Sequence, residues 1–391
     1  MHLESTPELE RFRSEVRAFI AEHTPGGRRR AGVRAPEPDE LPALRVWIAK
    51  LYAAGYLGQA WPVEYGGRPD ARPEHGFIVA EELARVRAWG EIGAAPLAAG
   101  ALIAFGSDEL KRAFLPRIRT AEDLWCQLFS EPGAGSDLAA LSTRARLEGD
   151  SYLVTGQKVW TTNGHHADWG YLLARTSTEG KKQAGITAFA LDLRSPGVDV
   201  RPLREITGTS DFNEVFLEEV RIPANRVIGR VDDGWRVANA SLGHERSGVG
   251  ARGVELFAQL DQLLALAGSP TADGRAALAD SAVRQRVGRL AARVHVADKM
   301  SKAVQSRMVN GTEDPADAPL AKVFYSDVNL ELAETGVALQ GVEGIGVESD
   351  APWSDGWWQD AFLYARAYTI AGGANEVLKT IVAERALGLP R

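Results

Sequence analysis

The chain has 391 residues, of which 45% are hydrophobic and 25% charged, so it is long enough for two or three domains of ordinary globular composition. Its net charge is −7, from 45 Lys and Arg against 52 Asp and Glu, and this excludes an overall basic surface for nucleic acid. A single cysteine, Cys126, excludes a disulfide framework or a multi-cysteine metal site. No apolar run approaches the ~20 residues that span a bilayer, and the acidic N-terminus has no apolar signal core, so we expect a cytoplasmic protein without a membrane span.

Three zones follow one another along the chain. Residues 1–123 show helical spacing of apolar residues, interrupted by Pro and Gly at 36–42 and 65–69. Residues 124–232 hold short runs of β-branched and aromatic residues between Gly, Asn, Asp and Pro, which predicts a compact antiparallel β domain. Residues 233–391 return to long helical patterns typical of a bundle. We therefore expect a mainly α, α+β chain with a helical, a β and a helical domain at these boundaries.

The most informative segment is residues 127–137, QLFSEPGAGSD. Two glycines and a proline give a tight turn whose backbone can approach a planar or phosphorylated ligand closely. The hydroxyls of Ser130 and Ser136 can add hydrogen bonds to such a ligand. The segment lacks the lysine of a Walker loop and the strand–turn–helix context of a Rossmann fingerprint. Taken alone, it is equally well a surface turn between a helix and a strand.

As a whole string, the segment resembles the flavin loop of the acyl-CoA dehydrogenase family almost residue for residue. Residues 156–164, GQKVWTTNG, resemble that family's second flavin segment, and further matches lie at 60–67, 211–216 and 382–391. The resemblance therefore covers effectively the whole chain. It implies the acyl-CoA dehydrogenase fold, in which the middle domain is an antiparallel β-barrel-like sheet and the C-terminal domain a four-helix bundle.

The resemblance also implies an activity. Members of the family use FAD to dehydrogenate the α,β bond of an acyl-CoA thioester to the trans-2-enoyl-CoA, in fatty acid or steroid side-chain catabolism. Electrons then pass to an external acceptor, an electron-transferring flavoprotein or a similar protein. An acyl-CoA oxidase, which lets O₂ reach the reduced flavin, is the less favoured alternative at this chain length.

By resemblance, a set of residues contacts the cofactor: Gln127, Phe129, Ser130, Ser136, Trp160, Thr161, Thr162, Gln340, Gly344, Asn375 and Glu376. Trp160 stacks on the flavin, Thr162 approaches N5, and Ser136 reaches the pyrophosphate or the CoA part of the substrate. An aromatic wall excludes water, and donors near the ring stabilise the reduced anionic flavin. Taken alone, Trp160 is equally a tryptophan of the sheet core and Thr162 an ordinary turn residue.

Dehydrogenation needs a base for the α-proton. The family takes a glutamate from one of two positions, and the commoner one falls here on Gly372, which has no carboxylate. Its backbone N–H can still polarise the thioester carbonyl. The second position, used by isovaleryl- and long-chain-type members, precedes an arginine at the start of a bundle helix. It falls on Glu245, so the resemblance gives Glu245 as the base and Arg246 as support for the substrate loop.

Simpler readings of these residues remain open. A carboxylate near a helix start is favourable against the helix dipole, so a cap or a partner of Arg246 is the alternative reading of Glu245, and the base reading leads because the other position has no carboxylate. His244 is a rival base, with a packed or solvent-facing neighbour as the simpler reading. His165 and His166 look like a metal pair, but adjacent residues point in different directions and no further ligand pattern surrounds them, so we expect no metal.

Three departures from the family pattern concern the adenylate half of the FAD site and the assembly. Residues 280–290 lack the Phe-Gly pair with which members contact a neighbour's cofactor. The Gly-Thr-Ser/Ala loop reads GAN at residues 373–375, which loses a phosphate-binding hydroxyl. The Gln-x-x-Gly-Gly-x-Gly loop is only partly kept at residues 340–346, where Glu343 is unhelpful unless it faces away.

Two hypotheses about assembly follow. The chain is either a homo-oligomeric enzyme, a dimer or tetramer, or a flavin-binding or structural subunit of a heteromer, such as a heterotetramer with a second dehydrogenase-like subunit. Similar sequences act on steroid side chains or other bulky acyl-CoAs. Gly243, Gly248 and Gly250 could make room for a bulky or medium-to-long acyl group, although helix-packing glycines are the commoner case.

Overall fold

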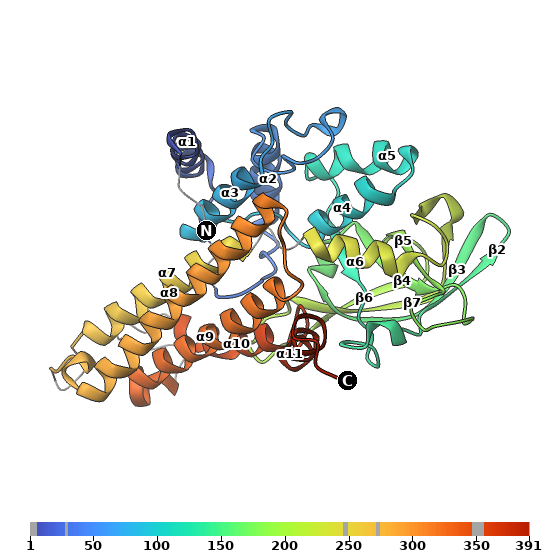
Figure 1. Cartoon of the computed structure of the whole chain (residues 1–391). Helices are drawn as coiled ribbons and strands as arrows, with labels where there is room; N and C mark the ends of the chain where they lie inside the picture. Colours follow the sequence, from blue (N-terminus) through green and yellow to red (C-terminus); the bar gives the residue numbers. More distant parts are fainter. Residues whose placement is uncertain (1–5, 28–29, 245–248, 271–273, 346–355, 391) are drawn as a thin grey trace. The chain divides into compact units, whose positions relative to one another are not determined.

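The computed structural model describes residues 6–27, 30–244, 249–270, 274–345 and 356–390. The chain forms two compact units (Figure 1). Unit 1 is built from residues 1–32, 73–88 and 247–391, and unit 2 from residues 33–72 and 89–246. Each unit therefore combines segments that lie far apart in the sequence.

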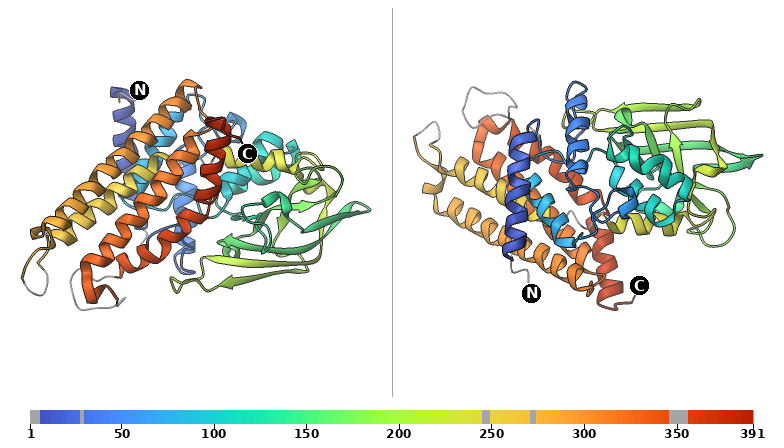
Figure 2. Two further views of the ribbon diagram at one scale, coloured as in Figure 1. Left: turned by 60° about the horizontal axis from the view of Figure 1, so that its bottom comes forward. Right: turned by 90° about the horizontal axis from the view of Figure 1, so that it is seen from above.

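Unit 1 is helical. Its helices are α1 (Pro7–His23), α3 (Pro73–Arg85), α7 (Val249–Gly268), α8 (Ser281–Asn310), α9 (Asp317–Gln340), α10 (Trp357–Ile370) and α11 (Asn375–Ile381). A short 3-10 helix, η7 (Gly341–Ile345), follows α9, and a short π-helix, η8 (Val382–Ala386), follows α11. The long helices α7 to α10 lie side by side, with α9 against α7, α8 and α10 (Figure 2).

The core of this bundle follows the helical period. Residues three and four apart share one face of a helix, so apolar residues at that spacing form a stripe that can be buried. Such stripes come from all four helices: Leu256, Leu260 and Leu263 of α7, Val287, Leu290 and Val294 of α8, Val328 and Leu332 of α9, and Trp357, Trp358, Ala361 and Ala365 of α10. The sequence pattern that indicated a bundle is thus the pattern of its buried contacts.

An ion-pair cluster joins α1 to α3. The carboxylate of Glu82, which is nearly buried, accepts hydrogen bonds from Arg13 at 2.8 Å and from Arg17 at 2.9 Å. Burial opposes ionisation of Glu82, but the two arginines outweigh burial and lower the pKa of this carboxyl. At the start of α1, the Thr6 hydroxyl accepts a hydrogen bond from the Leu9 N–H at 3.2 Å and so caps the helix.

Unit 2 combines helices with a sheet. Its helices are α2 (Leu41–Ala53), α4 (Ala95–Phe105), α5 (Asp108–Arg119) and α6 (Gly234–His244). Its strands are β1 (Trp125–Leu128), β2 (Arg144–Glu148), β3 (Ser151–Thr162), β4 (Trp169–Arg175), β5 (Ile186–Asp192), β6 (Val198–Leu203), β7 (Phe212–Pro223) and β8 (Val227–Ile228). The strand order is β6-β7-β3-β2-β4-β5-β8, with β1 paired to β4.

Most strand pairs in this sheet are antiparallel, and only the pairs that β4 makes with β1 and β2 are parallel among the described strands. Buried residues alternate along β7, as expected when one face of a strand packs on a core, with a one-residue shift at 218–219: Val215, Leu217, Val220 and Ile222. Strand β5 is buried almost throughout because α6 packs against it, beside α4 (Figure 1).

The predicted fold class is confirmed. Helices dominate the chain, a largely antiparallel sheet occupies its middle, and a bundle of long helices occupies its C-terminal part. The domain boundaries at 123/124 and 232/233 remain a prediction. The two compact units divide the chain differently, because residues 73–88 pack with the bundle while the rest of the N-terminal helices from residue 33 onward pack with the sheet.

The contact between α9 and α10 gives a test of the bundle. A Cβ added at Gly336 would lie 2.1 Å from the indole of Trp358, so the two helices approach this closely only because residue 336 is glycine. Gly336→Ala should therefore lower the free energy of unfolding by about 1–3 kcal/mol, the usual cost of overpacking. The matched control is Gly288→Ala in α8, where an added Cβ meets nothing within 4 Å. It should stabilise by up to about 1 kcal/mol, because alanine is the better helix former.

Urea unfolding of the two variants, followed by circular dichroism, measures both effects. Equal stability of Gly336→Ala and Gly288→Ala would contradict the close packing of α9 on α10.

Candidate active site

The glycine-rich loop begins where β1 ends. Phe129 turns its side chain into the unit, where it meets the Tyr171 ring edge to face at a centroid distance of 4.9 Å. Glu131 and Ala134 exchange backbone hydrogen bonds of 3.1 and 3.0 Å and close the turn between them. Around Gly133 and Gly135 there is open space, since an added Cβ would meet nothing within 4 Å at either. The loop thus has a packed inner side and an open outer side.

A buried ion pair lies under the inner side of the loop. The Lys158 ammonium donates to the Glu131 carboxylate at 2.8 Å and to the Phe129 carbonyl at 3.1 Å. The Lys158 side chain is 0% exposed and the Glu131 side chain 4% exposed. The Glu131 carboxylate also accepts from the Ser142 N–H and hydroxyl at 2.6 and 2.7 Å and from the Thr143 N–H at 2.9 Å. One carboxylate and one ammonium therefore hold the loop to β3 and to the segment that precedes β2.

Both members of the pair are charged at neutral pH. Burial alone would raise the pKa of Glu131, but the Lys158 cation and the hydrogen bonds from Thr143 and Ser142 outweigh it and lower this pKa to about 2. Burial lowers the pKa of Lys158 to about 8, with Glu131 acting in the opposite sense. A buried charge without a partner would be costly, so the two side chains stabilise each other's charged form.

Trp160 stands out from the rest of the sheet. Its side chain is 61% exposed, and its backbone is in the left-handed region with φ of 59°. The β3–β7 register shifts between Lys158 and Thr161, so a bulge carries the residue out of the regular ladder. A bulky residue in this conformation is strained, and strain of this kind clusters at functional sites. The reading of Trp160 as a core tryptophan is therefore wrong.

The neighbours of Trp160 separate into buried and accessible side chains. Thr161 is fully buried, and its carbonyl accepts a hydrogen bond from the Asn213 side-chain amide at 2.9 Å. Thr162 ends β3 and is half-buried, as is Gln127 on β1. Ser136, on the outer side of the loop, is exposed. In unit 2 the side chains of Gln127, Trp160 and Thr162 can therefore meet a ligand, whereas the Thr161 side chain serves the core.

A second loop, in unit 1, carries Gly372. It follows α10 and has two consecutive residues at positive φ, Gly372 at 64° and Gly373 at 94°. The Lys322 ammonium donates to the Gly373 carbonyl at 2.7 Å and to the Asn375 side-chain oxygen at 2.9 Å. Asn375 in turn donates to the Asp327 carboxylate at 3.0 Å. A buried lysine therefore holds a carbonyl of this loop, as Lys158 does in unit 2.

The other residues predicted for the cofactor also lie in unit 1. The Asn375 side chain is occupied within the unit by Lys322, Ser326 and Asp327. The Gln359 amide donates to the Gln340 side-chain oxygen at 2.9 Å and to the Gly344 carbonyl at 3.2 Å. Glu376 is exposed in the first turn of α11. Contact of these four predicted residues (Gln340, Gly344, Asn375 and Glu376) with the cofactor stays a prediction.

Part of the predicted site lies outside the described residues. Glu245, the predicted base, and Arg246 fall there, and so does Gly248. Helix α6 ends at His244, whose side chain is not described, nor is that of Glu343. Their predicted roles are neither supported nor opposed by the geometry.

The two adjacent histidines make ordinary hydrogen bonds. His165 pairs with the Asn213 side-chain oxygen at 3.0 Å and His166 with the Pro36 carbonyl at 3.0 Å. Burial, reinforced by the neighbouring His165, lowers the pKa of His166. Within the described ranges, no three His, Cys, Asp or Glu side chains are grouped so that they could hold a metal ion.

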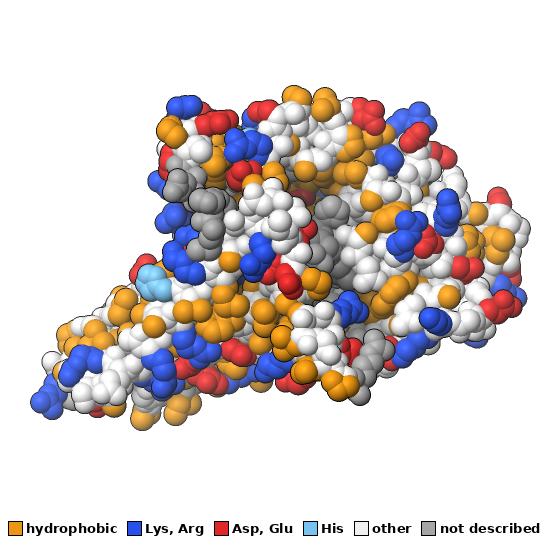
Figure 3. All heavy atoms as spheres, in the orientation of Figure 1, with side chains coloured by type: hydrophobic (Ala, Val, Ile, Leu, Met, Phe, Trp, Pro, Cys, Tyr) orange, Lys and Arg blue, Asp and Glu red, His pale blue; other side chains and the backbone are white. Residues whose placement is uncertain are grey.

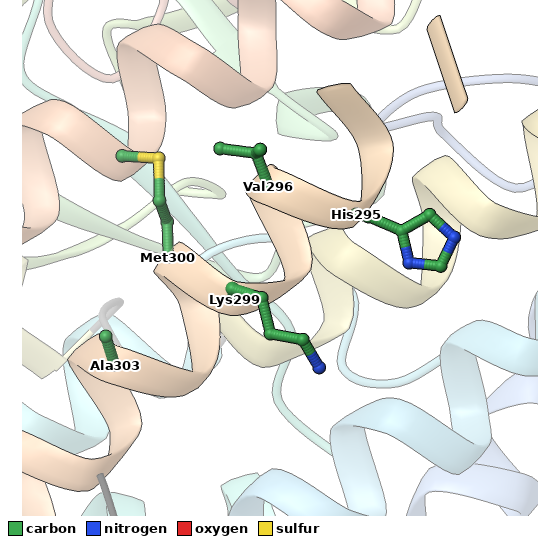
Figure 4. Close-up of a pocket in the computed structure, with 5 residues that line it drawn as sticks. All are labelled: His295, Val296, Lys299, Met300 and Ala303. Atoms are coloured by element: carbon green, nitrogen blue, oxygen red, sulfur yellow. The ribbon is translucent and has the colours of Figure 1, made fainter. Parts of the chain in front are cut away.

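Two hollows of unit 1 add no evident chemistry. One is a shallow apolar depression on a single helix, α8, lined by His295, Val296, Lys299, Met300 and Ala303 (Figure 4). The other is a cavity of about 40 Å³ between α7 and α10, with Glu255, Gln259, Trp357 and Tyr368 in its wall. By that measure it has room for only about three water molecules.

Sequence reasoning missed the two buried lysines. Lys158 lies within the GQKVWTTNG segment, yet only the aromatic and hydroxyl residues there received a role. The signal was a cation placed directly before Val159 in a strand, and both residues prove to be buried. Lys322 gave no comparable signal, because a lysine in an amphipathic helix is usually solvated.

Comparison with known proteins identifies the family. The N-terminal, middle and C-terminal domains of acyl-CoA dehydrogenase match residues 6–122, 126–220 and 232–387. The chain therefore belongs to the acyl-CoA dehydrogenase family, and it is an oxidoreductase of this class. The family to which it belongs typically binds FAD. The resemblance found in the sequence is confirmed over the whole chain.

Individual relatives agree with this assignment. The chain is 37% identical to acyl-CoA dehydrogenase IpdE1 of Mycobacterium tuberculosis, over 98% of both chains. Among solved structures, it superposes on a chain of the ChsE4-ChsE5 complex from Mycobacterium tuberculosis with a TM-score of 0.85 and 29% identity, and on a chain of the Tcur3481-Tcur3483 steroid ACAD with a TM-score of 0.87 and 27% identity. Each superposition covers 100% of both chains. None of the described helices has the length and apolar character that crossing a membrane requires.

The buried ion pair predicts a specific acid sensitivity. An unfolded glutamate has a pKa of about 4.3, whereas in the fold the pKa of Glu131 is about 2. The stabilisation from its ionised form is therefore complete above the unfolded pKa and is lost as pH falls towards the folded pKa. Wild type should exceed Glu131→Gln by about 1–3 kcal/mol of unfolding free energy near neutral pH, and this difference should shrink as the pH falls below about 4.

Urea titrations of the two proteins between about pH 7 and pH 3 measure the difference directly. A difference that stays constant over this range would mean that the carboxylate contributes nothing through its charge.

Proposed function

We propose that this chain catalyses the α,β-dehydrogenation of an acyl-CoA thioester to the trans-2-enoyl-CoA, with FAD as its cofactor. The observation that carries the proposal is Trp160, a tryptophan held on a strained backbone with most of its side chain outside the core. Strain of this kind persists where the surrounding structure imposes it and is concentrated at functional sites. An exposed indole beside an open glycine-rich loop offers a flat apolar surface to a planar ring.

The residues present in unit 2 fit a flavin. Val159 donates to the Ser130 carbonyl at 3.0 Å, which places the loop alongside the strand segment that leads to Trp160. Gln127, the backbone of Phe129, Ser130 and Thr162 would supply polar contacts to the ring, and Ser136 would reach the pyrophosphate or the CoA part of the substrate. When bound, FAD supplies the hydride acceptor. The protein supplies the aromatic wall, the oriented donors and the base.

The proposed base is Glu245, whose carboxylate removes the α-proton. The support comes from the sequence, because the family's other base position is Gly372 and has no carboxylate. Gly372 is proposed to donate its backbone N–H to the thioester carbonyl, which needs no side chain. Its positive φ and the Lys322 contact to the next carbonyl fix the course of this backbone. The remaining reading of Glu245 is a helix cap or a partner of Arg246.

Electrons are proposed to leave to an external acceptor, an electron-transferring flavoprotein or a similar protein. Cys126 is the only cysteine, is fully buried, and has its pKa raised by burial to about 12. A buried thiol of this kind forms no redox relay with a partner. A cytoplasmic setting is consistent with such a chain and belongs to the proposal.

The proposed substrate carries a bulky or medium-to-long acyl group, in fatty acid or steroid side-chain catabolism. Its support is the similarity to the Tcur3481-Tcur3483 steroid ACAD. The proposed assembly is a homo-oligomer, dimer or tetramer, or a heteromer such as a heterotetramer with a second dehydrogenase-like subunit. The two-component names of both similar structures support a heteromer. Hydrophobic side chains gather over the bundle on the face seen in Figure 3. The helices of the bundle also have exposed apolar residues, among them Leu264 of α7, Val296 of α8 and Leu320 of α9.

The cofactor can be tested directly. The purified chain should be yellow with non-covalently bound FAD, and a suitable acyl-CoA added without oxygen should bleach the oxidised flavin band. Turnover should be fast with an artificial one-electron acceptor and slow with O₂ alone. Rapid stoichiometric peroxide formation would favour the oxidase, and a folded chain that refuses FAD under all conditions would refute the catalytic proposal.

The FAD content of the singly expressed chain also separates the two assemblies. A full complement of FAD in a homo-oligomer supports the self-contained enzyme. Binding of FAD only after addition of a second dehydrogenase-like chain supports the heteromeric subunit, and light scattering reports the mass of either assembly.

The base assignment has its own test. Glu245→Gln is nearly isosteric and should keep the fold, the FAD and acyl-CoA binding, while flavin reduction in a stopped-flow experiment should slow by roughly 10²–10⁴, the usual contribution of a general base. If Glu245 is only a cap, the variant should instead lose about 1 kcal/mol of stability and reduce its flavin normally. Reduction at the wild-type rate would rule out Glu245 as the base.

Two variants accompany this test. His244→Gln is the control for a change next to Glu245 and should reduce its flavin at close to the wild-type rate. Gly372→Glu in the Glu245→Gln background should restore part of the rate if both positions face one α-carbon. The new side chain has space, since an added Cβ at Gly372 meets nothing within 4 Å, but its φ of 64° adds strain that costs about 1–2 kcal/mol.

A further inference from the structure

We propose that Lys158 is a positioning residue for the cofactor: by holding the Phe129 carbonyl from inside the sheet, it turns the Ser130 N–H outward as a hydrogen-bond donor to the FAD. The inference rests on the proposed function, since it concerns the same FAD site. It assigns a role to a side chain that touches neither substrate nor cofactor.

The direction of the Ser130 N–H follows from peptide geometry. In a planar trans peptide, the carbonyl of one residue and the N–H of the next point in opposite directions. The Phe129 carbonyl points inward, because it accepts from the fully buried Lys158 ammonium at 3.1 Å. The Ser130 N–H must then point away from Lys158. In the described part of the chain no acceptor is found for this N–H, and Ser130 itself is only half-buried.

A second contact prevents the peptide from rotating. The Ser130 carbonyl accepts from the Val159 N–H at 3.0 Å. The carbonyls on both sides of the Ser130 Cα are therefore held by β3, one by the side chain of Lys158 and one by the backbone of the next residue. The donor is thus oriented before any ligand arrives, which reduces the entropy lost on binding.

Stability alone does not explain a buried lysine at this place. Replacing a buried ion pair by apolar side chains of similar volume is often neutral or stabilising. An apolar side chain, however, cannot bind the Phe129 carbonyl, whereas a charge-assisted hydrogen bond holds it firmly. Lys158 also lies two residues before Trp160, at the start of the bulge in β3. The Lys158 side chain therefore fixes the peptide that carries the Ser130 N–H, and it lies at the start of the bulge that carries Trp160.

A matched pair of variants isolates the tether, which is the hydrogen bond from the Lys158 amine to the Phe129 carbonyl. Glu131→Gln removes the carboxylate charge but leaves the Lys158 amine, whether charged or neutral, to donate to the Phe129 carbonyl. The double variant Lys158→Met/Glu131→Gln differs only by the loss of that amine, and it contains no unpaired buried charge that would unfold the protein. Lys50→Met, at an exposed position of α2, is the control for losing a lysine elsewhere in unit 2.

We expect Lys50→Met to bind FAD with a dissociation constant within about threefold of wild type, because it leaves the loop and its anchors unchanged. Glu131→Gln is the reference for the double variant, because the two differ only in the Lys158 amine. The double variant should bind FAD about 10-fold more weakly than Glu131→Gln, the equivalent of one lost hydrogen bond to a ligand. Its flavin circular dichroism in the visible range should change, since the ring loses an oriented partner. Urea unfolding of the FAD-free proteins should give the double variant and Glu131→Gln similar midpoints.

Limited proteolysis of the FAD-free proteins measures how firmly the tether holds the loop when no cofactor is bound. The double variant should be cut faster than Glu131→Gln within residues 129–137. If the wild-type chain binds no FAD, the proposed function fails, while faster cleavage still supports the tether. If the double variant matches Glu131→Gln in FAD affinity, visible circular dichroism and loop cleavage, Lys158 merely fills the core and the inference is overturned.

Discussion

The ion pair between Lys158 and Glu131 is the constraint on which the proposed flavin half of the site depends. A loop with two glycines and few packed side chains has little of its own to define its shape, and here its carbonyls are held from within instead. The Glu131 carboxylate gathers three protein donors besides the lysine. Because both charges are buried, moving one side chain away would leave the other as an unpaired buried charge, which is costly. The ion pair therefore fixes the backbone on the outer side of the loop.

Unit 1 repeats this arrangement with different chemistry. Lys322 holds the Gly373 carbonyl and is itself held by Asn375, which also contacts Ser326 and Asp327. Burial, helped by the nearby Arg252, lowers the pKa of Lys322 to about 8, and Asp327 and Glu376 oppose that shift. The family resemblance gave Asn375 as a cofactor contact, yet its side chain is already saturated by the unit's own groups. Each unit thus carries one loop of the predicted site, shaped by a buried amine that binds a backbone carbonyl.

The sequence was informative where a pattern maps directly onto a physical period or a motif. The stripes of α7 and α8, the alternation along β7 and the two flavin segments were all readable, and with them the fold class and family. The strained backbone of Trp160 could not be predicted from the sequence, because the bulge is set by the pairing of β3 with β7 and not by local residues. The segment 73–88 packs with the bundle although it belongs by sequence to the N-terminal helices, and such long-range packing leaves no local trace. The burial of Lys158 and Lys322 was not predicted for a similar reason, since only tertiary structure distinguishes a buried lysine from a solvated one.

In the proposed mechanism, Gly372 keeps the backbone N–H of the family's commoner base position but has no carboxylate. At φ of 64° a glycine is nearly free of strain, whereas a glutamate there would be strained. A glycine therefore holds this backbone, with its proposed N–H donor, at a lower conformational cost than a glutamate at the same position would. The proposed mechanism therefore takes its base from Glu245, the glutamate that precedes Arg246 in the sequence. With the proposed base at Glu245, no carboxylate occupies the space beside Gly372, where an added Cβ would meet nothing within 4 Å. An acyl group with a branch or ring next to the thioester would use such space, which agrees with the bulky substrate class that we propose.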